Sequence, residues 1–425
     1  MKTYKLLFAA ALATLGLSSI ASAQTAIYIS GAPATRAIWN QAILNTLTAK
    51  STGSPTITKY WSGGTVSTGY TTANQIVLTG GNLSGTAVTI YASWTGSTGG
   101  NQSVANTPPA TISALKVGFL SLSGSGSATA GGGNTFNATL NPQYPQVNLS
   151  DTLQSTLPFN GTTSVTTPAT SYVALTEATT HNPAVTGFEF VTNKGAPSRL
   201  SNITTNLAQT LFTTTDGTPL ALFSGSSADQ NIFIYPVGRD IASGARYILL
   251  AETGIGTANS NSLVQYAPAL NSGSTGITGI DAYPSTSGTI NLITPIAGNG
   301  GYSSFTPVLA VLSATSSDTV GYPVTYVTDS DATTVIGAGG HALNWNGVPY
   351  SVAAIQQGQY TYWSYLHVYY NNTGNYIQTN FPLAKSFADF LAADLATDVG
   401  TGAILTSSLS VTRSLDGGLV TGTYY

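Results

Sequence analysis

Apolar residues recur along this chain at two spacings, one typical of helices and one typical of buried strands. Residues 36–47 and 386–395 carry the helical spacing. Their apolar faces are formed by Ile38, Trp39, Ile43, Leu44 and Leu47 in the first stretch, and by Phe387, Phe390, Leu391 and Leu395 in the second. Residues 26–30 are a short apolar run that ends at a Gly-Ala-Pro turn, which predicts a buried strand leading into the first helix.

Further strands and helices are predicted in alternation along the chain. The strand patterns are at residues 87–94, 171–177, 187–195, 231–237 and 322–327, and the helical ones at 202–212 and from Arg246 onward. Because strands and helices interleave without an internal repeat, we expect the α/β class.

Two stretches rich in Ser, Thr and Gly interrupt this pattern, at about residues 101–170 and about 271–304. We interpret the first as an inserted β-hairpin region and the second as a loop insertion. For residues 123–134 a disordered linker is the alternative, because the composition there offers little to bury.

The N-terminus has the pattern of a secretory signal peptide. Lys2 and Lys5 precede an apolar run at residues 6–17, and Ala21-Ser-Ala23 supplies the small residues that a signal peptidase reads. We expect cleavage of residues 1–23 and export to the periplasm or the exterior. No other stretch approaches the roughly 20 apolar residues of a membrane-spanning helix, so we expect no membrane insertion.

Charge is scarce in this sequence. Charged residues are 6% of the total, and without the two signal-peptide lysines 10 basic residues stand against 15 acidic ones, a formal charge of −5. Nucleic acid and anionic membrane surfaces are therefore poor partners. The chain has no cysteine, which excludes disulfides, thiolate metal sites and cysteine nucleophiles.

The most informative chemistry lies in residues 237–246, where Arg239 and Arg246 flank the turn Ser243-Gly244 before an apolar helix. A helix start offers unpaired backbone N–H groups and a positive dipole end, and a guanidinium adds a planar fork of donors. Together these groups suit an oxyanion. The alternative is a solvated arginine at a strand end followed by an ordinary turn.

Taken in order, five segments resemble the phosphate-type substrate-binding proteins of ABC transporters, a two-lobed periplasmic family of the type II class. They are residues 31–35 (Gly-Ala-Pro-Ala-Thr), 96–100 (Gly-Ser-Thr-Gly-Gly), 173–177 (a strand ending in Thr-Glu, where the family has Ser-Asp), 187–195 and 239–245 (Arg-Asp-Ile-Ala-Ser-Gly-Ala). Weaker likenesses follow at 319–322 and 355–360. The resemblance spans most of the mature chain and is interrupted by the two insertions.

This resemblance implies a two-lobed type II periplasmic-binding-protein-like fold with β-rich insertions. The first lobe would comprise residues 24–187 and 344–425, and the second lobe residues 188–343.

The resemblance also implies the site. Arg239 would neutralise the ligand charge, Thr35 and Ser243 would donate hydroxyl hydrogen bonds, and Ser97 would donate from both its hydroxyl and a backbone N–H at a helix start. Gly244 belongs to the same turn as Ser243. Glu177 would accept a hydrogen bond from a protonated ligand oxygen, which favours hydrogen phosphate over sulfate.

Three positions depart from the family pattern. Glu177 stands where an aspartate is usual, and Ala245 replaces a threonine, which removes a hydroxyl donor. Arg36 follows Thr35 where an aromatic residue is often found, and it either supplies the missing donor or lies on the helix surface. Arg246 would pair with Asp240 or the opposite lobe rather than with ligand.

The resulting hypothesis is an exported solute-binding protein that captures phosphate or another small tetrahedral oxyanion for an ABC importer, without a cofactor. A structural or adhesive surface protein on the same two lobes is the alternative, favoured by the low charge and the polar insertions. An enzyme is not expected, because the only histidines, His181, His341 and His367, lack metal-ligand spacing and no nucleophile elbow is visible. Residues 329–331 (Asp-Ser-Asp) are interpreted as a solvated turn rather than a calcium site.

Overall fold

The computed structural model describes residues 25–62, 69–105, 116–123, 133–134, 140–157, 173–178, 182–257, 263–281, 301–302, 304–397 and 402–422. The expected signal peptide, His181 and parts of both expected insertions lie outside these ranges.

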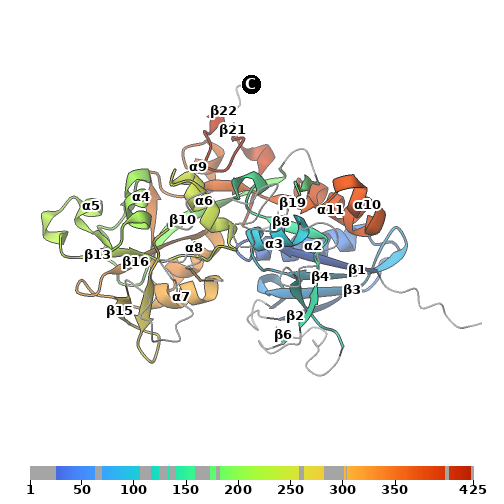
Figure 1. Ribbon diagram of the computed structural model, residues 1–425, viewed down its shortest axis with the longest axis horizontal. Coiled ribbons are helices and arrows are strands. Elements are labelled where there is room, and N and C mark those ends of the chain that lie inside the picture. The colour runs from blue at the N-terminus through green and yellow to red at the C-terminus, as the bar shows by residue number, and fades with distance from the viewer. Residues whose placement is uncertain are drawn as a thin grey trace, which may run out of the picture.

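The chain forms two lobes, each built on a large sheet (Figure 1). The first sheet has the strand order β6-β2-β3-β4-β1-β8-β19-β9. Its strands are β1 (Thr25–Gly31), β2 (Thr58–Ser62), β3 (Gln75–Leu83), β4 (Thr86–Ser93), β6 (Gly133–Asn134), β8 (Val147–Ser150), β9 (Thr176–Glu177) and β19 (His367–Tyr370).

The second sheet has the order β11-β17-β10-β16-β13-β12, and β18 and β20 also pair with β10. Its strands are β10 (Ala184–Thr192), β11 (Asn202–Ile203), β12 (Thr218–Pro219), β13 (Phe233–Pro236), β16 (Tyr322–Thr328), β17 (His341–Trp345), β18 (Trp363–Tyr365) and β20 (Ile404–Leu405). Strands and helices interleave in both lobes, so the predicted two-lobed α/β class is confirmed.

Short antiparallel pairs lie outside these sheets: β5 (Val117–Leu120) with β7 (Leu140–Gln143), β14 (Ala267–Leu270) with β15 (Ile277–Asp281), and β21 (Val411–Thr412) with β22 (Thr421–Gly422). The α-helices are α2 (Arg36–Lys50), α3 (Ser97–Ala105), α4 (Thr205–Thr213), α5 (Ala221–Ser224), α6 (Gly244–Glu252), α7 (Phe305–Ser313), α8 (Asp329–Gly337), α9 (Val352–Gln356), α10 (Tyr376–Asn380) and α11 (Pro382–Leu395). No helix in the described ranges is both long and apolar enough to span a membrane.

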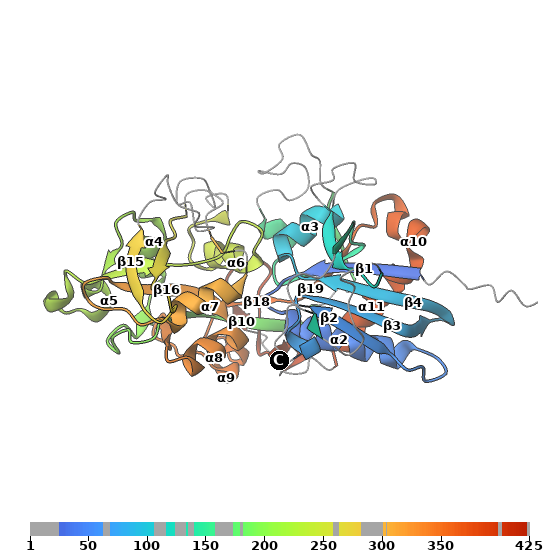
Figure 2. The same cartoon turned by 90° about the horizontal axis from the view of Figure 1, so that it is seen from below.

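The first lobe packs α2 and α11 together on one face of its sheet, and α3 lies on the other face (Figure 2). Most residues of the apolar faces predicted for α2 and α11 are buried, whereas Leu44 and Phe390 are only partly buried. Trp39, Ile43, Phe387 and Leu391 are fully enclosed with Ile29 of β1.

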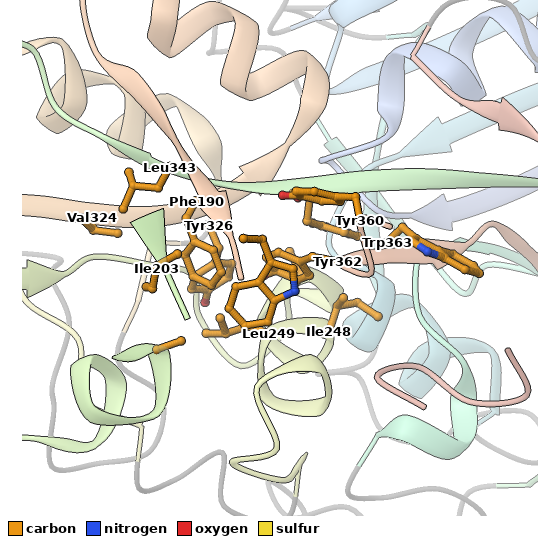
Figure 3. Packing of buried hydrophobic residues seen from close by; sticks show 14 of the residues in the cluster. Phe190, Ile203, Ile248, Leu249, Val324, Tyr326, Leu343, Tyr360, Tyr362 and Trp363 are labelled. Carbon is orange, nitrogen blue, oxygen red and sulfur yellow. The ribbon is translucent and has the colours of Figure 1, made fainter. Parts of the chain in front are cut away.

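The second sheet is covered on both faces. Successive side chains of a strand point to opposite faces of the sheet, so neighbouring residues of one strand pack in two different hydrophobic cores. Phe190 packs with Tyr326 and Tyr362 on one side (Figure 3), whereas Val191 and Val327 pack beneath α7 and α8 on the other.

Strand β10 lies at the junction of the lobes, because Ala184 packs in the core of the first lobe and Val185 in the core of the second. Its residues 185–187 pair with β18, and residues 188–192 pair with β16. The C-terminal strand β20 pairs with the start of β10, and Leu409 and Val411 pack in the core beneath the second sheet. The segment that the sequence assigns to the first lobe therefore contacts both lobes, and the expected lobe limits stay a prediction.

Candidate functional site

Three loops of the first lobe meet at one edge of its sheet. Strand β1 runs parallel to both β4 and β8, so the carboxyl ends of these strands lie side by side. The loop after β1 carries Thr35, the turn after β4 leads to Ser97 at the start of α3, and β8 is followed directly by Asp151.

Two loops of the second lobe come from the ends of another parallel pair, β13 and β16. The loop after β13 carries Arg239 and Ser243, and the end of β16 leads to Asp331 in the first turn of α8. Gly244 begins α6, with Ser243 as its N-terminal cap residue, so the turn predicted at 243–244 does open a helix.

The loops of the two lobes touch. Gly99 N–H donates to the Ala242 carbonyl across the lobes, with a distance of 3.4 Å. A Cβ on Gly96 would lie 2.1 Å from that carbonyl oxygen, and one on Gly244 would lie 2.0 Å from Asp151 Oδ1. Glycine is required at both positions because the opposing backbone or carboxylate fills the place of a side chain.

Asp151 and Ser97 form the centre of this contact. Ser97 Oγ donates to Asp151 Oδ1 (2.5 Å), and Asp151 N–H donates back to Ser97 Oγ (3.0 Å). Thr152 Oγ1 also donates to Asp151 Oδ1 (3.0 Å). Burial raises the pKa of the Asp151 carboxyl, while these two hydroxyls and the positive charge of Arg239 act to lower it.

Arg239 is buried, with 5% of its surface exposed. Its Nε donates to the Tyr302 carbonyl (3.0 Å), and its N–H donates to Tyr326 Oη (3.1 Å). Arg246 holds the backbone of Arg239 in place, because its Nη1 donates to the Arg239 carbonyl (3.0 Å).

Carboxylates from both lobes surround the Arg239 charge. Burial raises the pKa of Asp331 to about 6, although the charges of Arg36 and Arg239 act to lower it. Burial likewise raises the pKa of Asp240, against the charges of Arg239 and Arg246. Asp331 is buried rather than part of the solvated turn that the sequence suggested, because α8 begins at Asp329 and turns it inward.

Thr35 and Arg36 lie on the first-lobe side of the contact. Thr35 Oγ1 accepts a hydrogen bond from Trp39 Nε1 (2.9 Å), which leaves its hydroxyl proton available to donate. Arg36 is held by the carbonyls of Pro33 (2.6 Å) and Thr72 (2.9 Å), and its charge interacts with Asp331 and Arg239. Arg36 is thus only partly exposed and faces the second lobe.

Glu177 occupies another place. It lies on β9 at the edge of the first sheet, where its Oε1 is 2.7 Å from His367 Nδ1. His367 is fully buried and stacks on Tyr369. The carboxylate that lies against Ser97 and Gly244 is Asp151.

Asp151, Asp331 and Thr98 are not among the site residues expected from the sequence. Thr98 follows Ser97 in α3, and its Oγ1 is buried without a hydrogen-bond partner among the described residues. Asp151 could have been recognised from the sequence. Strand β8 ends at Ser150 and is followed by Asp151, which gives the Ser-Asp pattern that the family has where residues 173–177 were matched. No group of three or more His, Asp or Glu side chains in the described ranges is arranged to hold a metal ion.

No protein-family model matches the chain, and no curated protein matches it. Among solved structures it is similar to a chain named as a phosphate ABC transporter substrate-binding protein with bound phosphate from Clostridium perfringens, with a TM-score of 0.45 and 11% identity over 90% of this chain and 100% of that chain. It is also similar to an ABC-type phosphate transport receptor from Vibrio cholerae, with a TM-score of 0.41 and 12% identity over 89% of this chain and 99% of that chain.

Proposed function

We propose that this protein is an exported solute-binding protein that captures a small tetrahedral oxyanion, with phosphate as the preferred ligand, between its two lobes. The observation that carries the proposal is the burial of Arg239 where the Ser97–Asp151 pair of one lobe meets the Ser243–Gly244 turn of the other. Binding there would require both lobes, so ligand capture and lobe closure would be coupled.

Each group has a role in this proposal. Arg239 neutralises the ligand charge, and Thr35 and Ser243 donate from their hydroxyls. The Ser97 hydroxyl is engaged by Asp151, so Ser97 contributes its backbone N–H at the start of α3. Asp151, in place of Glu177, accepts a hydrogen bond from a protonated ligand oxygen, which favours hydrogen phosphate over sulfate.

The same proposal includes export after cleavage of residues 1–23, delivery of the ligand to an ABC importer, and binding without catalysis. The direct contact of Gly96 and Gly99 with Ala242 favours a second candidate, a structural surface protein with permanently closed lobes. Ligand binding distinguishes the two.

The test is calorimetry with phosphate, sulfate and molybdate on the mature protein, on Arg239→Ala and on Arg199→Ala. Arg199 is a matched control because it lies on the second lobe with 44% of its side chain exposed, paired with Asp229. We expect phosphate binding by the native and Arg199→Ala proteins, and a loss of about 100-fold or more in Arg239→Ala, since a buried charged hydrogen bond is removed. If none of the three anions binds the native protein, the oxyanion proposal is wrong.

A further inference from the structure

The C-terminal segment 411–418 runs at the junction of the lobes (Figures 1 and 2). It is anchored on the second lobe through Arg413, whose Nη1 lies 3.0 Å from Glu252 Oε2 of α6, with 0% and 6% of the two side chains exposed. The Arg413 guanidinium also lies 4.0 Å from the centroid of the Trp363 ring. Gly417 packs so closely on α6 that a Cβ would be 2.3 Å from the Ala251 carbonyl carbon.

Asp416 of the same segment reaches toward the first lobe. Its Oδ2 accepts hydrogen bonds from Leu153 N–H (2.8 Å) and Thr156 Oγ1 (2.7 Å). These two residues belong to the turn that begins at Asp151, the carboxylate of the candidate site. Asp416 therefore holds both the backbone and a side chain of this turn.

The turn at residues 151–156 is itself tied to the first sheet by Gln154. Its N–H donates to Tyr369 Oη of β19 (3.4 Å), and its Nε2 donates to the Val173 carbonyl (2.9 Å). Its Oε1 accepts from Leu175 N–H (2.7 Å). Residues 411–418, which are anchored on α6, are thus hydrogen-bonded to the turn at residues 151–156, which is anchored on the first sheet. This contact connects the two lobes in addition to β10.

A neutral side chain such as asparagine could accept the hydrogen bonds from Leu153 and Thr156 with a smaller desolvation cost than the Asp416 carboxylate. Asp416 Oδ1 and His367 Nε2 are both buried without a hydrogen-bond partner in the part of the chain that the structure describes. Burial raises the pKa of Asp416, although the charges of His367 and Arg413 act to lower it. Burying a carboxylate with one unpaired oxygen opposes folding, so the two hydrogen bonds that Asp416 accepts hold the segment and the turn together against this cost.

We propose that residues 411–418 form a strap that holds the two lobes together, and that Asp416 is a positioning residue which fixes the turn carrying Asp151. The expected effect of Asp416 on ligand affinity rests on the proposed oxyanion binding, whereas its expected effect on lobe opening is independent of that proposal. Loss of the Asp416 contacts would leave the Asp151 turn held to α6 only by its direct packing, such as that against Gly244, so the lobes would separate more readily and the site would be less often complete.

Lobe separation can be measured directly, because the native chain contains no cysteine. Ala49→Cys on α2 and Thr333→Cys on α8 place one exposed spin label on each lobe. Distances between the labels are then compared by electron–electron double resonance in the parent protein, Asp416→Ala and Asp416→Asn. Phosphate affinity is measured on the same proteins by calorimetry.

We expect Asp416→Ala to shift the label distances to longer values and to weaken phosphate binding by about tenfold or more, as two hydrogen bonds to a charged group are lost. Asp416→Asn keeps an oxygen that accepts from Leu153 and Thr156, so it should restore both measurements. Leu419→Ser is the matched control, because Leu419 directly follows the strap and is 89% exposed.

Unchanged distances in Asp416→Ala would overturn the strap, and failure of Asp416→Asn to rescue would overturn the positioning role. If Asp416→Ala does not fold, Thr156→Ala removes one of the two donors and should act in the same direction, with rescue by Thr156→Ser. If the native protein binds no phosphate, sulfate or molybdate, the proposed function fails, and the label distances still decide whether the strap exists.

Discussion

Gly244 shows how a single residue controls the candidate site. Its missing side chain makes room for Asp151 Oδ1, which would lie 2.0 Å from a Cβ, and for Thr152 Oγ1, which would lie 2.3 Å from it. The two glycines at 96 and 244 thus let the loops of opposite lobes approach at the level of the backbone. At Gly244 the requirement comes from the opposing loop, whereas Gly96 also has a φ of +119°, which its own turn demands and which favours glycine.

Gly244→Ala should weaken phosphate binding by at least about tenfold, because contacts this short force the Asp151 turn or α6 to move. The measurement is calorimetry beside Gly337→Ala, a change at a helical glycine of α8 where an added Cβ would meet nothing within 4 Å. Equal affinities for the two variants would show that the lobes do not close at this turn.

At the scale of elements, helix α11 shows that the helical spacing of apolar residues predicts a helix reliably. Residues 386–395 predicted the helix and its buried face, and the structure extends it to Pro382, which stands in the first turn where its missing N–H costs nothing. Strand β9 illustrates the opposite case. The predicted strand at 171–177 is reduced to Thr176–Glu177 among the described residues, because only this part pairs with β19.

Two phenylalanines of α11 provide a matched pair. Phe387 is fully buried against the first sheet, whereas Phe390 is only partly buried beneath Lys50. Phe387→Ala should lower the free energy of unfolding by about 3–5 kcal/mol, since it leaves a cavity, and Phe390→Ala by less than about 1.5 kcal/mol. Urea denaturation measures both, and equal losses would contradict the packing described for α11.

At the scale of the whole molecule, buried and partly buried carboxyl groups gather where the lobes join. Asp151, Asp331 and Asp240 lie around Arg239, and Glu189 lies on β10, the strand that joins the lobes. Burial raises the pKa of all four. A chain with so few charges has therefore placed several of them at the lobe junction.

Glu189 makes the resulting pH dependence testable. Burial, together with the negative charge of Asp329, raises its pKa from 4.5 to about 8. The folded protein then binds the proton more tightly than the unfolded chain, so this group lowers stability as pH rises from about 4.5 to about 8 and no further above that range. Glu189→Gln should remove this slope and be more stable than the native protein by about 1–3 kcal/mol at pH 8.

Urea denaturation at pH 5 and pH 8 checks the prediction, with Asp216→Asn as the exposed-carboxylate control. The same pH slope in Glu189→Gln and the native protein would mean that Glu189 is ionised in both states, against the shift assigned to it.

The sequence by itself determined the α/β class, the helices at residues 36–47 and 386–395, and the glycines at the starts of α3 and α6, although residues 97–100 of the expected turn belong to α3. These features follow from local periodicity and from residues whose backbone preferences are strong. It also singled out Arg239, which the structure shows to be buried, while the binding role of this residue stays a prediction.

Only the tertiary structure decided which groups meet. Asp151 lies in a stretch that the sequence suggested to be an insertion. In the structure the strand before it, β8, pairs directly with β1, and this pairing brings Asp151 to Ser97. Glu177 has the right chemistry but sits beside His367. The C-terminal segment returns across both lobes, so Asp416 reaches the Asp151 turn. Such contacts depend on strand order and on pairings between residues far apart in the chain, which local patterns do not encode.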